Sequence, residues 1–125
     1  MVTAEEFIKD MEKKCPGKVI SMKDIGRETR LKFTVEACTL IQQNNMPEKV
    51  FIIERLRKEN VDINKLAYPH VWKVGSIEYR IGYYIIGKIG KKKDKWTWGQ
   101  FCPIIPQEDL DKLIKKAEKE GTILK

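Results

Sequence analysis

The stretch that decides the expected fold is Ile77–Phe101, IEYRIGYYIIGKIGKKKDKWTWGQF. Over Ile77–Ile89 the side chains alternate as they do in a half-buried strand, and the alternation resumes over Lys95–Phe101. The segment between them, Gly90–Asp94, is rich in glycine and lysine and is typical of a hairpin loop. A shorter strand over Val71–Val74, joined through a two-residue turn, completes a predicted three-stranded antiparallel meander.

The rest of the chain predicts one more hairpin and four helices. Lys18–Lys23 and Thr29–Glu36 have strand patterns, and the loop Asp24–Glu28 between them makes a hairpin. Helical spacing and helix-end signals predict helices over Thr3–Cys15, Val35–Gln43, Pro47–Asn60 and Glu108–Lys119. The helix Val35–Gln43, capped at Thr34, would cut the strand Thr29–Glu36 short. The expected fold class is therefore α+β. We expect one domain over residues 1–125, whose antiparallel sheet consists of the N-terminal hairpin plus the three-stranded C-terminal meander, packed with about four helices.

Composition and cysteine usage bear on the compartment. The 125 residues are 42% hydrophobic and 34% charged, as in a globular domain. No stretch approaches the roughly 18 apolar residues of a membrane span, and the acidic start Met1–Glu6 does not resemble a secretory signal. Cys15, Cys38 and Cys102 are odd in number and widely spaced, which predicts three free thiols, no disulfide and no zinc site. We therefore expect a cytoplasmic protein without a membrane partner.

Catalytic motifs are not evident. His70 is the single histidine, which limits acid–base and nucleophilic catalysis near neutral pH. Glu78-Tyr79-Arg80 is similar to the Glu-x-Lys element of restriction-type nucleases, with Arg in place of Lys, so nuclease activity is the enzymatic alternative. Gly87–Lys91 has the glycines and lysines of a phosphate loop but lacks its spacer and its terminal Lys-Ser/Thr pair. The sequence thus predicts a protein that is not an enzyme and has no cofactor and no metal.

The charge distribution points to binding instead. The chain carries 25 basic and 18 acidic side chains, a net charge of +7, and residues 61–105 hold eight basic and three acidic groups. On the strand Ile77–Ile89 one face combines basic and aromatic residues next to the lysine-rich loop, as a surface for single-stranded nucleic acid does. The predicted nucleic-acid-binding residues are Arg80, Tyr84, Lys88, Lys91, Lys92, Lys93 and Lys95.

Two alternatives stay open. Trp96 and Trp98 share a strand face and fit either a core stripe beneath a helix or a base-stacking surface. Over Val35–Lys58, two predicted helices around the turn Gln43–Met46 resemble a helix-turn-helix.

The expected function is a non-enzymatic module that binds DNA or RNA. The alternative is a protein-interaction or inhibitory accessory module whose basic face docks an acidic partner protein.

Overall fold

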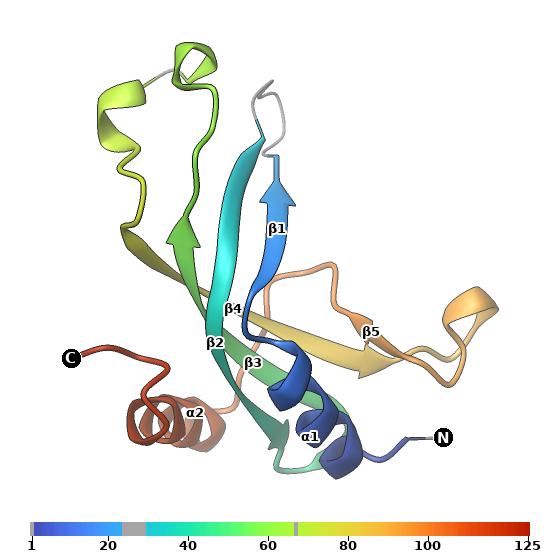
Figure 1. The fold of residues 1–125 in the computed structure, drawn as a ribbon. Helices are drawn as coiled ribbons and strands as arrows, with labels where there is room; N and C mark the ends of the chain where they lie inside the picture. Colours follow the sequence, from blue (N-terminus) through green and yellow to red (C-terminus); the bar gives the residue numbers. More distant parts are fainter. Residues whose placement is uncertain (1, 24–29, 67) are drawn as a thin grey trace.

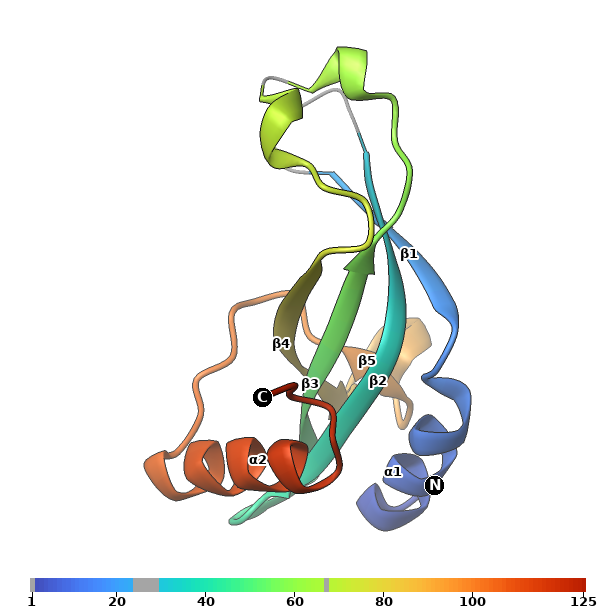
Figure 2. The same cartoon turned by 60° about the vertical axis from the view of Figure 1, so that its left-hand side comes forward.

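A computed structural model describes residues 2–23, 30–66 and 68–125, which form one five-stranded antiparallel sheet and two α-helices. Each strand pairs with the next along the chain, and the sheet curls into a half-barrel (Figure 1). The helices lie on opposite sides of the strands (Figure 2). The elements are α1 (Ala4–Lys14), β1 (Lys18–Met22), β2 (Leu31–Gln43), β3 (Met46–Lys58), β4 (Ile77–Ile86), β5 (Trp96–Trp98) and α2 (Gln107–Lys119).

The first helix follows the sequence prediction closely. Thr3 Oγ1 accepts a hydrogen bond from the Glu6 amide at 3.2 Å, and Glu6 Oε1 accepts one from the Thr3 amide at 3.2 Å. This reciprocal capping box satisfies two amides that a helix start otherwise leaves unpaired. The last helix is also confirmed: acidic residues occupy its first turn, and Gly121 follows it with a φ of 80°.

The two predicted middle helices are wrong, because both segments are strands. Residues 35–43 continue β2, residues 46–58 form β3, and Asn44 and Asn45 make the turn between them. Since helices cover both faces of β3, its four successive residues from Val50 to Ile53 are all buried. A strand apolar on both faces loses the alternation that identifies strands and matches helical spacing equally well. The helix-turn-helix interpretation is therefore wrong as well, because it required these two helices.

Pro47 also favoured the incorrect prediction of a helix over Pro47–Asn60, because proline is common at the first position of a helix. In the structure it lies near the start of β3, where the register is irregular: Gln43 pairs with Met46, while Gln42 pairs with Val50. Proline has no amide to contribute to a ladder and is tolerated at such places.

The predicted sheet arrangement also needs correction. Val71–Val74 is not a strand, since Val71 ends the 3₁₀ turn η2 (Pro69–Val71), which follows a similar turn, η1 (Ile63–Lys65). Instead β4 pairs with β3, and Lys58 N donates to Ser76 O at 3.0 Å. One five-stranded sheet, in which β3 lies between β2 and β4, thus replaces the expected hairpin plus three-stranded meander. Strands Lys18–Met22 and Leu31–Gln43 do pair, but the predicted loop Asp24–Glu28 lies outside the described residues.

The core divides between the two faces of the sheet. On the α1 face, Ala4 and Phe7 of the helix pack on Leu40, Val50 and Ile52, and a neighbouring cluster surrounds Cys15, Phe33, Val35 and Leu56. On the α2 face, Leu113 and Ala117 pack on Ile41, Phe51, Ile53 and Tyr83. Neither α-helix is long and apolar enough to cross a membrane.

A disulfide joins Cys15 and Cys38, so the expectation of three free thiols is wrong. The Cα atoms lie 6.3 Å apart because α1 packs against β2 and places its last turn beside that strand. A sequence separation of 23 residues gave no local sign of this contact. Cys102 is free and exposed. The cysteines therefore no longer argue for a reducing compartment.

Candidate nucleic-acid interface

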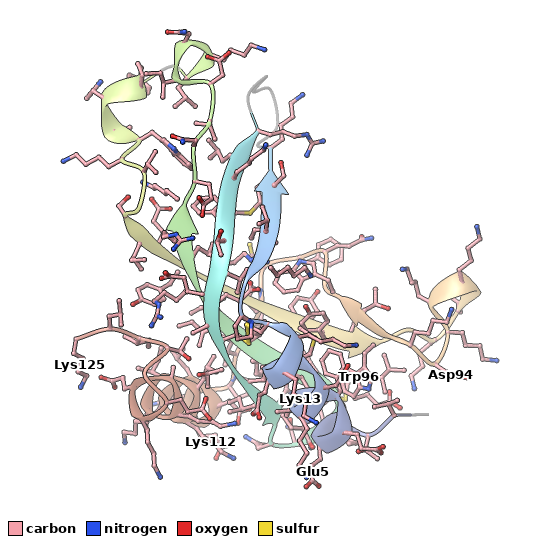
Figure 3. All side chains as sticks on the ribbon, in the orientation of Figure 1. Glu5, Lys13, Asp94, Trp96, Lys112 and Lys125 are labelled. Carbon is pink, nitrogen blue, oxygen red and sulfur yellow. A yellow bond between two sulfur atoms is a disulfide. The ribbon has the colours of Figure 1, made fainter. Side chains whose placement is uncertain are left out.

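The predicted binding residues fall in two places. Lys88, Lys91, Lys92, Lys93 and Lys95 lie in the connection between β4 and β5, which we call the lysine loop (residues 88–95). Arg80 and Tyr84 lie on the α1 face of β4 with Trp96 and Trp98 of β5. The loop projects beyond the end of the sheet, and its Asp94 lies next to Trp96 (Figure 3).

Backbone contacts give the lysine loop its shape. Gly87 N donates to Lys95 O at 3.1 Å, and Asp94 N donates back to Gly87 O at 2.9 Å. The turn η3 (Gly90–Lys92) lies between these bonds, with a φ of 67° at Gly90 and 62° at Asp94. Glycine adopts such angles without strain, and Asp is among the few other residues that tolerate them.

The charges of the loop are presented to solvent. Lys91, Lys92, Lys93 and Lys95 are all exposed, and none of them has a carboxylate within ion-pair distance in the part of the chain that the structure describes. Lys88 differs, since its Nζ lies 2.6 Å from Oε2 of Glu48, although the side chain is 66% exposed. The loop therefore offers four lysines whose ammonium groups are free to contact an anion.

A groove beside the loop limits that basic surface on one side. It has a volume of about 480 Å³, and its walls include the carboxylates of Glu6 and Asp10 on α1. Asp94 and Lys95 line it from the loop, together with the ring of Trp96. The carboxylates of Glu6, Asp10 and Asp94 outnumber the ammonium group of Lys95 in the groove, so its electrostatic potential disfavours an anion there.

The aromatic residues near the loop are packed against each other. Trp96 stacks on Phe7 with ring centroids 4.8 Å apart, and its Nε1 donates to Val2 O at 2.9 Å. Tyr84 contacts Phe7 at 4.9 Å and Trp98 at 5.1 Å, both edge to face. Burial raises the pKa of the Tyr84 phenol, and the negative charge of Glu54 raises it further. These contacts bear on the alternative left open by the sequence: the two tryptophans are partly buried and pack against the α1-face core.

Arg80 is engaged within the protein. Its Nε donates to Oε1 of Glu54 at 2.7 Å, and the two side chains are 27% and 7% exposed. The guanidinium lies 4.5 Å from the ring centroid of Trp98, and Nη1 donates to the Met22 sulfur at 3.5 Å. The ring fits there because Gly82 has no side chain: a Cβ would lie 2.6 Å from Trp98 Cζ2. Arg80 thus neutralises a buried carboxylate, a role its sequence position did not reveal.

Sequence reasoning missed Glu54 and Glu48, the partners of Arg80 and Lys88. Glu54 had a signal, since it directly follows the apolar run from Val50 to Ile53, and a carboxylate at a buried position needs a cationic partner. Glu48 had none, because 40 residues separate it from Lys88.

Metal binding and histidine-based catalysis find little support in the described residues. They contain no group of three His, Cys, Asp or Glu side chains that could hold a metal ion. His70 is exposed in η2, edge-on to Tyr68 with ring centroids 6.4 Å apart. Comparisons with protein-family models, curated proteins and solved structures give no significant match to this chain.

Proposed function

We propose that this protein is a non-enzymatic module that binds nucleic acid through phosphate contacts of the lysine loop. The observation that carries the proposal is the group of four exposed lysines, Lys91, Lys92, Lys93 and Lys95, without carboxylate partners in the described chain. Lysine side chains that neutralise phosphates release condensed counterions, and this release drives sequence-independent binding.

The packing on the α1 face refines the proposed mode of binding. Tyr84, Trp96 and Trp98 are engaged with α1 and with each other, so we do not assign base stacking to these three rings. Arg80 is held by Glu54, and we assign it to the fold instead of the interface. Binding through the loop alone reads no bases, so single strands and duplexes should bind with similar affinity.

The test compares two triple variants that remove the same charge. The loop variant removes three exposed lysines from the lysine loop by Lys91→Ala, Lys92→Ala and Lys93→Ala. The helix variant removes three exposed lysines from α1 and α2 by Lys13→Ala, Lys112→Ala and Lys119→Ala. Lys13 and Lys112 project from α1 and α2 (Figure 3). Fluorescence anisotropy with labelled single-stranded and duplex oligonucleotides gives affinity across a range of salt concentrations.

For the loop variant we expect a loss of at least about tenfold in affinity at low salt, and a salt slope smaller by about two to three units. The helix variant should keep the slope of the wild-type protein. Equal losses in the two variants would mean that only net charge matters. If neither variant changes the binding, the acidic protein partner becomes the better account of the basic loop.

A further inference from the structure

The outer edge of β4 is only partly used within the chain. β5 pairs with residues 84–86 of β4, and Gly99 N donates to Tyr83 O at 2.8 Å. Beyond that point the chain leaves the edge and continues to α2. Backbone groups on an antiparallel strand point to alternate sides, and the bond at Tyr83 shows that the odd-numbered residues face outward. The amides and carbonyls of Ile77, Tyr79 and Ile81 therefore point away from β3.

These outward groups have no backbone partner in the described part of the chain. The side chains along this edge are accessible as well, since Tyr79 is 40% and Ile81 is 36% exposed. Proteins usually protect a free edge with charged side chains, above all lysine, with proline or with a bulge. The two charged residues of this edge, Glu78 and Arg80, are already paired within the chain. The segment Ile77–Gly82 contains neither lysine nor proline, whereas the opposite edge of the sheet, β1, begins with Lys18 and is followed by Lys23.

We propose that a second copy of this chain pairs with this edge, β4 against β4 in antiparallel register, about a two-fold axis through Tyr79. The sequence Ile77-Glu78-Tyr79-Arg80-Ile81 is self-complementary about its centre, with isoleucine at both ends and opposite charges on the two sides of Tyr79. In this register Tyr79 lies opposite Tyr79, each Ile77 lies opposite Ile81, and each Glu78 lies opposite Arg80 of the other copy. Such an isologous contact closes on itself and gives a dimer instead of a fibre.

Charge complementarity favours this occupant. Glu78 and Arg80 of the two copies are non-hydrogen-bonded neighbours in the paired strands, the type in which side chains come closest. Within one chain Glu78 accepts from Lys58 Nζ at 2.9 Å, and Arg80 pairs with Glu54. In the dimer, Glu78 of one copy lies beside Arg80 of the other, so the ion pairs Lys58–Glu78 and Arg80–Glu54 join into one row of alternating charges on the α1 face.

Apolar contacts complete the interface on the other face. The exposed rows of Tyr79 and Ile81 from the two copies lie side by side across the axis and shield each other from water. The backbone groups of residues 77, 79 and 81 acquire partners, and the two half-barrels share one continuous sheet. This inference does not depend on nucleic-acid binding.

Sedimentation equilibrium gives the first test. We expect wild-type protein to show twice the 14.6 kDa mass of one chain at about 200 μM, and Tyr79→Lys, which sets like charges opposite each other, to raise the dissociation constant at least about tenfold. Two controls should still dimerise. Val19→Lys adds the same charge to the edge strand β1, and Tyr79→Phe removes only the hydroxyl that accepts from Leu124 N.

Cross-linking tests the register without relying on the lysine variant. In a Cys102→Ser background, Tyr79→Cys places two thiols in a hydrogen-bonded pair with Cα atoms about 5.5 Å apart, within disulfide range. Oxidation should give a covalent dimer. Ile77→Cys alone should not cross-link, because its two copies lie roughly 14 Å apart along the strands, but it should cross-link when mixed with Ile81→Cys.

Three results would overturn the proposal. One is a wild-type protein that stays monomeric at about 200 μM. Another is a folded Tyr79→Lys variant, checked by circular dichroism, that dimerises as tightly as the wild type. The third is Ile77→Cys cross-linking to itself as readily as Tyr79→Cys, which would exclude the two-fold axis at Tyr79.

Discussion

Replacing Arg80 by alanine tests whether this residue serves the fold or the interface. The substitution leaves Glu54, whose side chain is 7% exposed, without its cationic partner on the α1 face. Breaking a buried ion pair by removing one member costs about 3–5 kcal/mol. Because Arg80 itself is 27% exposed, water can partly replace it, and we expect the lower end, about 3 kcal/mol. Trp98 also loses the guanidinium that covers its ring.

Urea unfolding followed by tryptophan fluorescence measures this loss, and a double-mutant cycle separates the pair from other effects. Glu54→Leu with Arg80→Leu removes both charges while keeping apolar volume, so the double variant should recover most of the stability that Arg80→Leu alone loses. We expect a coupling free energy of about 1–3 kcal/mol between the two residues.

A phosphate contact at Arg80 predicts the opposite pattern. Arg80→Ala would then leave the free energy of unfolding within about 0.5 kcal/mol of the wild-type value, while the salt slope of nucleic-acid binding would fall by about one unit. That result would refute the assignment of Arg80 to the fold and return it to the interface.

Three further predictions concern the α1 face. Reducing the Cys15–Cys38 disulfide should lower the free energy of unfolding by about 3 kcal/mol in the loop-entropy model, and equal urea midpoints with and without reductant would contradict this. Gly82→Ala should cost about 1–3 kcal/mol, since the new methyl group overlaps the Trp98 ring; an unchanged thermal midpoint would show that the ring can move aside. Because the folded-state pKa of Tyr84 is raised, its contribution to stability is present below pH of about 10 and is lost as the pH rises further. Tyr84→Phe should therefore lose less stability than the wild type in urea melts between pH 10 and 12, and identical losses would argue against the raised pKa.

The elements that sequence reasoning located correctly are those with local signals. The capping box at Thr3 and Glu6 and the helix-stopping pair Pro16-Gly17 mark the ends of α1 through short local patterns that need no tertiary information. The lysine loop is similar, because its glycines and charges exclude burial wherever the chain places it. These features depend on residues close together in the chain, which a single sequence displays directly.

The incorrect predictions concern residues whose burial and partners depend on tertiary contacts. Residues 50–53 are buried on both sides only because one helix from each end of the sequence covers β3, and no local pattern announces that arrangement. The same holds for Arg80, whose partner Glu54 lies 26 residues away on a neighbouring strand. The predicted alternation placed Arg80 and Tyr84 on one face correctly, but it could not show that α1 packs against this face.

The placement of the two helices also constrains the order in which the protein can fold during synthesis. The sheet is complete once β5 has emerged from the ribosome, but the apolar side chains of Ile41, Phe51 and Ile53 stay uncovered until α2 follows. Domains complete their folding only when all of their packing partners have been made. Translation must therefore pass Ala117 before the second face closes, and until then the apolar side chains of that face stay exposed to water on the nascent chain.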